Sequence, residues 1–211
     1  MKKSIFIAGA SGGIGKTLAK LAYNQGFEVI AAARDTNSLK DLGYHLVEAD
    51  FSKPMDIQQM ALEVAQFTST IDLWAYTAGD ILTARSWQTD AWDWQRIFDA
   101  NLNGAQKVFQ ACLPLLADDA HLFFIGAYID RMMLPGLGAY AASKAALEAY
   151  TAVLEKELKG KKVTLVRPGA VDTQFWKKVP FKMPADALTP EAVADQMLLA
   201  YEQGMSGLLD L

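Results

Sequence analysis

Short apolar runs alternate with amphipathic helical segments through most of this chain, and this alternation restricts the possible folds more than any other feature. The apolar runs, which we predict to be strands, cover residues 4–8, 27–33, 44–49, 71–76, 121–126 and 163–166, with a last apolar piece at 207–211. Helical periodicity falls at 14–25, 54–67, 90–116, 139–159 and 190–203. Apolar strands separated by helices favour the α/β class, with a doubly wound parallel sheet that binds ligands at the carboxyl ends of its strands.

A glycine-rich turn joins the first predicted strand to the first predicted helix. Its glycines let the backbone turn tightly and approach a ligand, while the amides and dipole of the following helix attract a pyrophosphate. The turn therefore favours a dinucleotide, with expected contacts from Gly9, Ser11, Gly12, Gly13, Ile14 and Gly15. Tight packing alone also selects such turns, so this turn by itself leaves both explanations open.

The residue after the second predicted strand normally selects the dinucleotide, because the adenosine ribose lies just beyond it. An acidic side chain there accepts a hydrogen bond from the 2′-hydroxyl of NAD, whereas an arginine pairs with the 2′-phosphate of NADP. Ala33 and Arg34 stand at this point and favour NADP(H) over NAD(H). Asp35 follows, so a shift of the strand register would reverse the preference. A solvated arginine at a strand end is the alternative without a cofactor role.

Tyr140 and Lys144 lie four residues apart near the start of the predicted helix 139–159, which places both side chains on one helix face. A free phenol loses its proton at about pH 10. A neighbouring ammonium lowers that pKa toward neutrality, as a group that exchanges protons with a substrate requires. Taken alone, the pair also fits a surface tyrosine beside a solvated lysine, so its meaning depends on the accompanying motifs.

The composition fits one compact domain over residues 1–211. Hydrophobic residues make up 52% of the chain and charged residues 21%, and no Pro/Gly/Ser-rich linker divides it. A net charge of -4 and a pI near 5.2 argue against nucleic acid or an anionic membrane surface as a partner. The first apolar run is too short for a signal segment or a membrane span, so we expect a cytoplasmic protein. His45 and His121 have no partner at metal-ligand spacing, and we expect no metal site.

Several motifs, in the right order along nearly the whole chain, resemble the short-chain dehydrogenase/reductase family. The matching residues are Gly9, Gly13 and Gly15 in the glycine turn, Asp50, the helix asparagine Asn101, the Tyr140/Lys144 pair, Pro168-Gly169 and Thr173. The resemblance implies a Rossmann-type sheet. Beyond the glycine turn, it implies cofactor contacts from Arg34, Asp50, Phe51, Ala78, Gly79, Tyr140, Lys144, Pro168, Gly169, Val171 and Thr173.

Two departures from the family pattern stand out. Tyr76-Thr77 replaces the usual pair of asparagines before Ala78-Gly79, which changes the polar groups that brace the central sheet. The catalytic serine of the family lies thirteen positions before the tyrosine, and this count reaches Ala127. The segment 120–142 contains no serine. Losing one donor to the developing oxyanion costs on the order of 3 kcal/mol in an enzyme that evolved to use it.

The resemblance implies a hydride transfer between NADP(H) and a small carbonyl or alcohol substrate. Tyr140 would act as general acid/base, Lys144 would lower its pKa and hold the ribose, and Asn101 would anchor a relay water. Ala127, Tyr128 and Trp176 are the expected substrate neighbours, and Tyr128 or a water could stand in for the serine hydroxyl. The alternative is a weakened or inactive NADP-binding protein that serves as a sensor or structural subunit.

The resemblance also implies a homodimer or homotetramer, and an alanine-rich stretch in the helix 139–159 would permit close helix packing. Trp87, Trp92 and Trp94 crowd the start of the long predicted helix 90–116. Core or interface packing is our first interpretation of these tryptophans, and a wall of the substrate pocket is the second.

Overall fold

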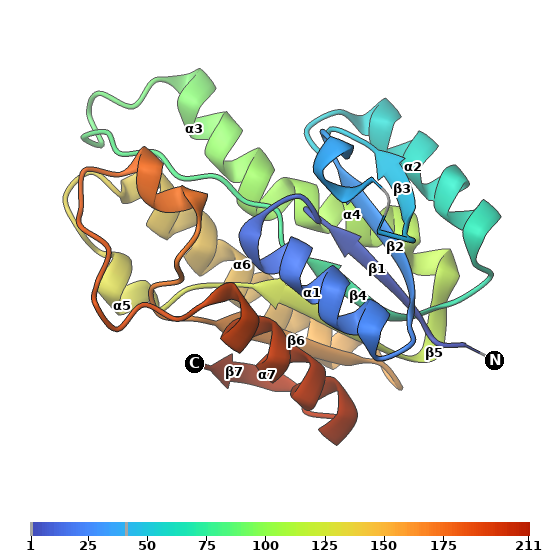
Figure 1. The fold of residues 1–211 in the computed structure, drawn as a ribbon. Helices are drawn as coiled ribbons and strands as arrows, with labels where there is room; N and C mark the ends of the chain where they lie inside the picture. Colours follow the sequence, from blue (N-terminus) through green and yellow to red (C-terminus); the bar gives the residue numbers. More distant parts are fainter. Residues whose placement is uncertain (1, 41) are drawn as a thin grey trace.

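Seven parallel strands form one sheet in the computed structural model, which describes residues 2–40 and 42–211. The spatial order is β3-β2-β1-β4-β5-β6-β7 (Figure 1). The strands are β1 (Ser4–Ala8), β2 (Glu28–Ala33), β3 (His45–Glu48), β4 (Ile71–Tyr76), β5 (Leu116–Ile125), β6 (Lys162–Arg167) and β7 (Gly207–Asp210). The predicted doubly wound α/β sheet is confirmed, and the last apolar piece is its edge strand. The order reverses between the neighbours β1 and β4, where such sheets have their ligand crevice.

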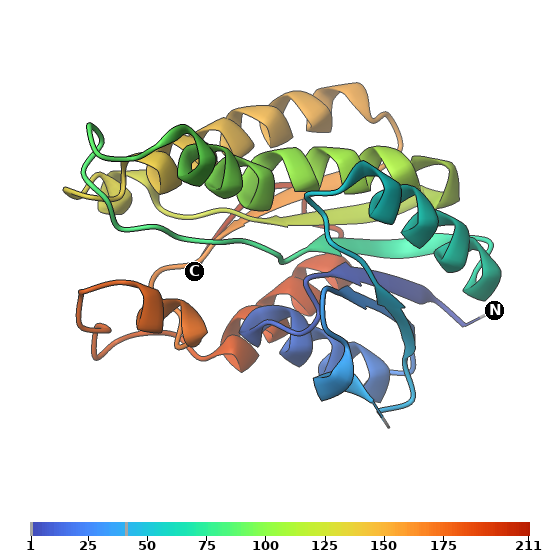
Figure 2. The same ribbon diagram turned by 90° about the horizontal axis from the view of Figure 1, so that it is seen from above.

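Helices cover both faces of the sheet, as Figure 2 shows. On one face lie α1 (Gly13–Asn24) and α7 (Pro190–Gln203), and on the other lie α2 (Pro54–Phe67), α4 (Gly104–Cys112) and α6 (Gly138–Glu157). Each face has its own apolar core, because the side chains of a strand alternate between the two faces. Phe6 and Trp74 belong to the core under α2 and α4, whereas Ile5 and Leu73 belong to the core under α1 and α7.

The helix predicted over 90–116 is interrupted. It consists of α3 (Ala91–Phe98), a π-helical turn η2 (Asp99–Asn103), α4 and a 3₁₀ turn η3 (Leu113–Leu115). Asparagine has a low helix propensity, so the sequence predicts a disturbance at Asn101, and the π-helical turn lies there. The predicted end of the helix and start of β5 are wrong, because Pro114 tightens the chain into η3 and β5 begins at Leu116 rather than at 121.

Three one-turn helices were not predicted from the sequence, since a single turn carries no helical period. These are η1 (Asn37–Leu39), α5 (Ile129–Met132) and η4 (Gln174–Lys178). The segments that contain α5 and η4 follow the carboxyl ends of β5 and β6 (Figure 1). Both segments therefore lie at the edge of the sheet where the ligand crevice is expected.

Candidate active site

The glycine turn between β1 and α1 packs directly against the segment that follows β4. Gly9 has a φ of +89°, and a Cβ at this position would overlap the backbone of Ala78. Thr77 reinforces the contact, because its amide and its hydroxyl both donate to the Ala8 carbonyl, at 2.8 and 2.9 Å. The turn and the start of α1 thus lie at the carboxyl ends of β1 and β4, where the strand order reverses.

The unusual Tyr76-Thr77 pair braces the sheet with different groups from those of the family pattern. Thr77 joins β4 to β1, as described above, and the buried Tyr76 hydroxyl donates to the Ala100 carbonyl at 2.9 Å. Ala100 lies in the π-helical turn η2. The phenol therefore ties β4 to the helical segment that carries Asn101.

The strand register at the end of β2 places Arg34 just beyond the last paired residue. Ala33 pairs with Glu48 of β3, and Arg34 is exposed after it. The Asp35 carboxylate accepts a hydrogen bond from the Asn37 amide at 2.8 Å and so closes the turn that leads into η1. The register shift that would put Asp35 in the position of Arg34 does not occur.

An open cavity of about 700 Å³ lies between the ends of β2 and β3 and the helix α2. Arg34, Asp50 and Lys53 are among the residues that line it. Asp50 also holds the turn after β3, because its carboxylate accepts hydrogen bonds from the Ser52 amide and hydroxyl, at 3.0 and 2.8 Å. The neighbouring Phe51 turns inward and packs on Tyr76, with ring centres 5.9 Å apart.

Asn101 lies buried in the π-helical turn and is hydrogen-bonded on all sides of its amide. Its Nδ2 donates to the Asp80 carbonyl at 2.8 Å and to the Ser143 hydroxyl at 3.1 Å, and its Oδ1 accepts from the Asp80 amide at 3.1 Å. Ser143 in turn donates to the Tyr140 carbonyl at 2.8 Å. This network fixes the start of α6 relative to the segment after β4.

Tyr140 and Lys144 share the inward face of α6, as the spacing predicts, and both are buried. The Lys144 ammonium lies 5.8 Å from the centre of the Tyr140 ring and donates to the Ile125 carbonyl at 2.7 Å. A Cβ placed on Gly79 would lie 2.8 Å from Asn101 Oδ1 and 3.9 Å from Lys144 Nζ. Asn101, Lys144 and Gly79 therefore meet at the end of β4.

Burial changes the pKa values of this pair in a way that the sequence did not predict. Burial raises the pKa of Tyr140 to about 12, whereas we expected the lysine to lower it toward neutrality. Burial also lowers the pKa of Lys144 to about 8. The expectation fails in this structure because the ammonium is directed at the Ile125 carbonyl rather than at the phenol oxygen.

Ala127 stands two residues after the end of β5 and is 7% exposed. The backbone before it is fixed, because the Gly126 amide donates to the Val166 carbonyl at 2.7 Å. Tyr128 then packs under two guanidinium groups, with its ring centre 4.7 Å from Arg131 and 5.6 Å from Arg167. Ala127 is the residue that a count of thirteen positions back from Tyr140 reaches.

The segment after β6 returns to the glycine turn. A Cβ on Gly13 would lie 2.8 Å from the Thr173 methyl group, so these two residues are in contact. Trp176 folds back on its own segment, with its indole N–H donating to the Val171 carbonyl at 2.8 Å. Phe175 lies beside the end of β4, since its Cζ is 3.5 Å from the Cβ position of Gly79.

Pro168 and Gly169 connect β6 to this segment. Pro168 is buried, and the Gly169 amide donates to the Leu211 carbonyl at 3.0 Å, which links the segment to the residue after β7. Val171 forms an isolated parallel bridge with Leu188 and is 9% exposed. These contacts hold the chain beside the carboxyl ends of β6 and β7.

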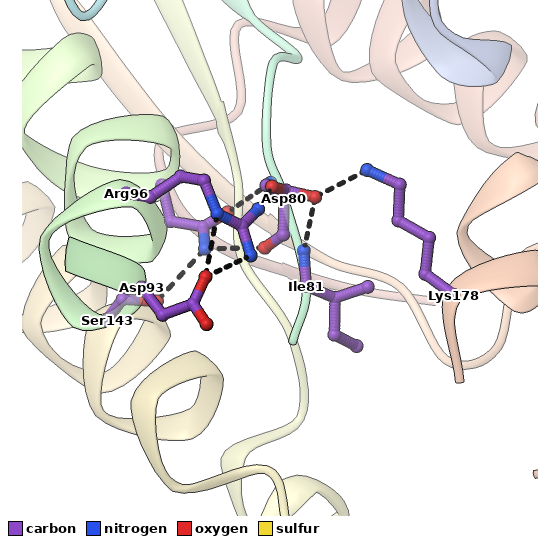
Figure 3. Close-up of polar contacts among 7 residues, drawn as sticks. Asp80, Ile81, Asp93, Arg96, Ser143 and Lys178 are labelled. Atoms are coloured by element: carbon purple, nitrogen blue, oxygen red, sulfur yellow. Dashed lines mark hydrogen bonds and ion pairs between the residues drawn. The ribbon is translucent and has the colours of Figure 1, made fainter. Parts of the chain in front are cut away.

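Four residues join this site that the sequence did not single out for a role. Ser143 fixes Asn101, while Asp80, Arg96 and Lys178 form an ion-pair cluster at the end of β4 (Figure 3). Only Ser143 left a signal in the sequence, because it precedes Lys144 and lies three residues after Tyr140 on the same helix. The ion pairs join residues that are distant in the chain, which no spacing rule reveals.

Neither histidine has a metal-ligand environment in the described ranges 2–40 and 42–211. His45 Nε2 lies 3.1 Å from Glu28 Oε1, and His121 Nε2 lies 2.7 Å from Thr164 Oγ1. Within these ranges no group of three or more His, Cys, Asp or Glu side chains could hold a metal ion. The helices in the same ranges also lack the combination of length and apolarity needed to cross a membrane.

Comparison with known proteins agrees with this geometry. The family model described as short chain dehydrogenase matches residues 3–183. An uncharacterised oxidoreductase of Staphylococcus epidermidis is 30% identical over 96% of this chain and 92% of its own length. The uncharacterised oxidoreductase YbbO of Escherichia coli is 31% identical over 95% of this chain and 82% of its own length.

Solved structures share the fold at lower identity. An alcohol dehydrogenase from Thermococcus sibiricus, solved with 5-hydroxy-NADP, superposes with a TM-score of 0.89 at 22% identity, over 100% of this chain and 96% of that one. A short-chain dehydrogenase from Streptomyces avermitilis gives a TM-score of 0.87 at 24% identity, over 100% of this chain and 89% of that one. With the family model matching residues 3–183, the chain belongs to the short-chain dehydrogenase/reductase family of oxidoreductases.

Proposed function

We propose that this oxidoreductase uses NADPH to reduce a small carbonyl compound, with Tyr140 as the general acid. One observation carries the proposal: Asn101, Lys144 and Gly79 meet at the end of β4, with Tyr140 on the same face of α6 as Lys144. The meeting point adjoins the crevice between β1 and β4, where a doubly wound sheet binds its ligand. A buried tyrosine and lysine have no structural reason to share such a place, because burying an ionisable group is costly.

The residues that line the crevice fit a dinucleotide. Gly9 and Gly13 keep the turn tight and free of side chains, because a Cβ on either residue would meet neighbouring protein atoms. The first amides of α1 face the same turn and favour an anion. A bound NADPH would supply the hydride. Arg34, which is exposed beyond β2 beside the cavity with Asp50, would pair with its 2′-phosphate.

Proton transfer is the task of the protein's own residues. As the carbonyl carbon gains the hydride, the O–H bond of Tyr140 breaks and its proton forms the new O–H bond of the alcohol. Because burial raises the pKa of Tyr140 to about 12, the phenol holds its proton at neutral pH, which is the form that reduction requires. The Lys144 ammonium would hold the nicotinamide ribose and stabilise the phenolate that remains. The backbone of the π-helical turn at Asn101 would anchor a water that returns the proton.

The oxyanion receives less help here than the family pattern provides, because Ala127 has no hydroxyl to donate. Tyr140 therefore carries most of the polarisation of the carbonyl, with a water or Tyr128 assisting at the place of the serine hydroxyl. We infer a slower chemical step than in an enzyme with the serine, by about a hundredfold or more for one missing donor. The substrate neighbours in this proposal are Ala127, Tyr128 and Trp176, together with Phe175.

The test is NADPH oxidation over a panel of aldehydes, ketones and quinones, with the parent and Tyr140→Phe measured side by side. The proposal predicts turnover by the parent and its loss in Tyr140→Phe, while both proteins bind NADPH with similar affinity. Equal turnover by the two proteins would contradict the role of Tyr140. NADH in place of NADPH serves as the control for the cofactor preference.

A second candidate function is NADP binding without chemistry, in a sensor or a structural subunit. Ala127 in the serine position favours it, because the hydroxyl that would assist the chemistry is absent there. This candidate predicts NADPH binding with no turnover by the parent on any panel member. Turnover that appears only in Ala127→Ser would show an intact scaffold whose chemistry is switched off.

Assembly and location complete the proposal. The 211 residues would act as one domain in a cytoplasmic homodimer or homotetramer, and the cytoplasmic location rests on the sequence alone. The outer face of α6 exposes the small side chains Ala145, Ala149 and Ala152, which would let a helix of a second copy approach closely. Light scattering of the purified protein tests the assembly, and a monomer at micromolar concentration would refute it.

A further inference from the structure

One carboxylate, that of Asp80, joins three elements at the carboxyl end of β4. Its Oδ1 accepts hydrogen bonds from Lys178 Nζ at 2.6 Å and from the Ile81 amide at 2.9 Å, and its Oδ2 pairs with the Arg96 guanidinium (Figure 3). Lys178 belongs to η4 and Arg96 to α3. The Asp80 side chain is only 15% exposed. A largely buried anion with two cationic partners from distant segments is a fixed junction rather than a solvated surface charge.

The backbone of Asp80 is held as firmly as its side chain. The Asn101 amide bonds to both the N–H and the C=O of Asp80, at 3.1 and 2.8 Å. The carboxylate is therefore presented to Lys178 in a fixed position, and little freedom is lost when the ion pair forms. The junction also connects η4 to the π-helical turn that carries Asn101.

The segment from Thr173 to Lys178 reaches from the turn after β1 to the residues that follow β4. At its start, the Thr173 methyl group touches Gly13 in the turn after β1. At its end, Lys178 reaches Asp80 after β4. Between them, Phe175 lies 3.5 Å from the Cβ position of Gly79. Since β1 and β4 are neighbours at the point where the strand order reverses, the segment spans the place where the dinucleotide is proposed to lie.

We propose that residues 173–178 form a bridging segment over the dinucleotide crevice, and that the Lys178–Asp80 ion pair fastens it and slows dinucleotide exchange. Lys178 and Asp80 are positioning residues in this scheme, and the inference rests on the proposed function. Phe175 stands beside Gly79, near Lys144, so a dinucleotide that enters or leaves must move the bridging segment. The ion pair must open for that movement.

The charges around Lys178 explain why Asp80 is needed. Burial, followed by the nearby Arg96 and Arg34, lowers the pKa of Lys178, so this ammonium sits among other cations. Asp80 is the anion that offsets their repulsion. The Lys178 side chain is 53% exposed, so the pair is partly screened by salt. Partly exposed pairs of this kind shift an equilibrium about two- to fivefold.

The first experiment uses the protein without dinucleotide. Amide hydrogen exchange of residues 174–179 is compared for the parent, Lys178→Gln, Lys178→Arg and Lys177→Gln at low salt. We expect exchange about two- to fivefold faster in Lys178→Gln and parental rates in Lys178→Arg, which keeps the charge. Lys177 is exposed on the same turn and has no ion pair among the residues that the structure describes, so Lys177→Gln should match the parent. In 1 M NaCl the parent should approach Lys178→Gln. Equal hydrogen-exchange rates in the parent and Lys178→Gln at low salt would contradict the proposal that the ion pair holds the bridging segment.

The second experiment measures NADPH dissociation by stopped-flow fluorescence with excess NADP⁺ as the chase. Lys178→Gln and Asp80→Asn should each release NADPH about two- to fivefold faster, and the double variant should release it no faster than either. Faster release in Lys178→Gln with slower release in Asp80→Asn would mean that Lys178 binds the dinucleotide directly. This result would contradict the proposal that the ion pair holds the bridging segment. A parent that binds no NADPH would overturn the proposed function, whereas the exchange rates still decide whether Lys178 and Asp80 hold the segment.

Discussion

Replacing Ala127 by serine would return a hydroxyl to the position two residues after β5, thirteen residues before Tyr140. The backbone at this position is fixed, because the Gly126 amide is bonded to Val166 and a Cβ on Gly126 would lie only 3.0 Å from the Leu165 side chain. The new side chain must therefore take the direction of the present methyl group, and residue 127 is only 7% exposed. We expect the hydroxyl to face the same space as that methyl group.

We expect the increase in kcat of Ala127→Ser to be smaller than the full contribution of one oxyanion donor. One donor to a developing oxyanion contributes about 3 kcal/mol in an enzyme that evolved with it, which is roughly a hundredfold in kcat. A site shaped without the donor should recover only part of this, so we expect an increase of about tenfold in kcat with little change in KM for NADPH. If the hydroxyl finds no partner in the resting protein, its burial costs about 1–3 kcal/mol of unfolding free energy.

The assay compares the steady-state kinetics and thermal unfolding of the parent, Ala127→Ser and Ala127→Cys on the best substrate of the panel. The thiol has nearly the shape of the hydroxymethyl group but is a weak donor, so Ala127→Cys should stay near the parental kcat. An Ala127→Ser protein that folds and binds NADPH like the parent but shows an unchanged or lower kcat would refute the reasoning. In that case another group already supplies the donor.

Two further predictions concern the cofactor and the core. Arg34→Ser should lower kcat/KM for NADPH by about ten- to a hundredfold and leave the value for NADH nearly unchanged, whereas Asp35→Asn should alter neither, because Asp35 is bonded to Asn37. An unchanged ratio of NADPH to NADH in Arg34→Ser would contradict the assignment. Burial and the nearby Lys162 lower the pKa of His121 to about 4. Between about pH 6.5 and pH 4 the unfolded chain therefore binds more protons than the folded protein, so the stability falls as the pH drops through this window. The free energy of unfolding is measured by urea denaturation at pH 7 and pH 4. Its decrease between the two pH values should be about 3 kcal/mol smaller in His121→Gln than in the parent, and equal decreases would contradict the lowered pKa of His121.

The alternation of apolar strands and amphipathic helices was enough to predict the sheet, because a parallel sheet buried on both faces needs strands that are apolar throughout. The break at Asn101 was also predictable, since asparagine has low helix propensity. The start of β5 was not. Asp118 and Asp119 are exposed, so this part of the strand lacks the apolar signal, and the register between β4 and β5 shifts there.

The features of the candidate site that the sequence could not predict have a common physical cause, because they depend on where side chains point in the folded protein. Spacing on a helix shows that Tyr140 and Lys144 share a face, but it does not show where a flexible ammonium points. Here the ammonium donates to the Ile125 carbonyl, and burial alone decides the direction of both pKa shifts. The ion pair of Asp80 with Lys178 joins residues 98 positions apart, so it depends on the folded path of two segments and has no local signature.

The most direct test of the account is the rate of hydride transfer in a single turnover. Enzyme saturated with NADPH is mixed with excess substrate, and the decay of NADPH absorbance is followed for the parent and for Tyr140→Phe, whose NADPH affinities are measured separately. We predict a similar NADPH affinity and a rate lower by about 10²- to 10⁴-fold in Tyr140→Phe, because only the proton donor is removed. Equal rates in the two proteins would contradict the claim that Tyr140 supplies the proton.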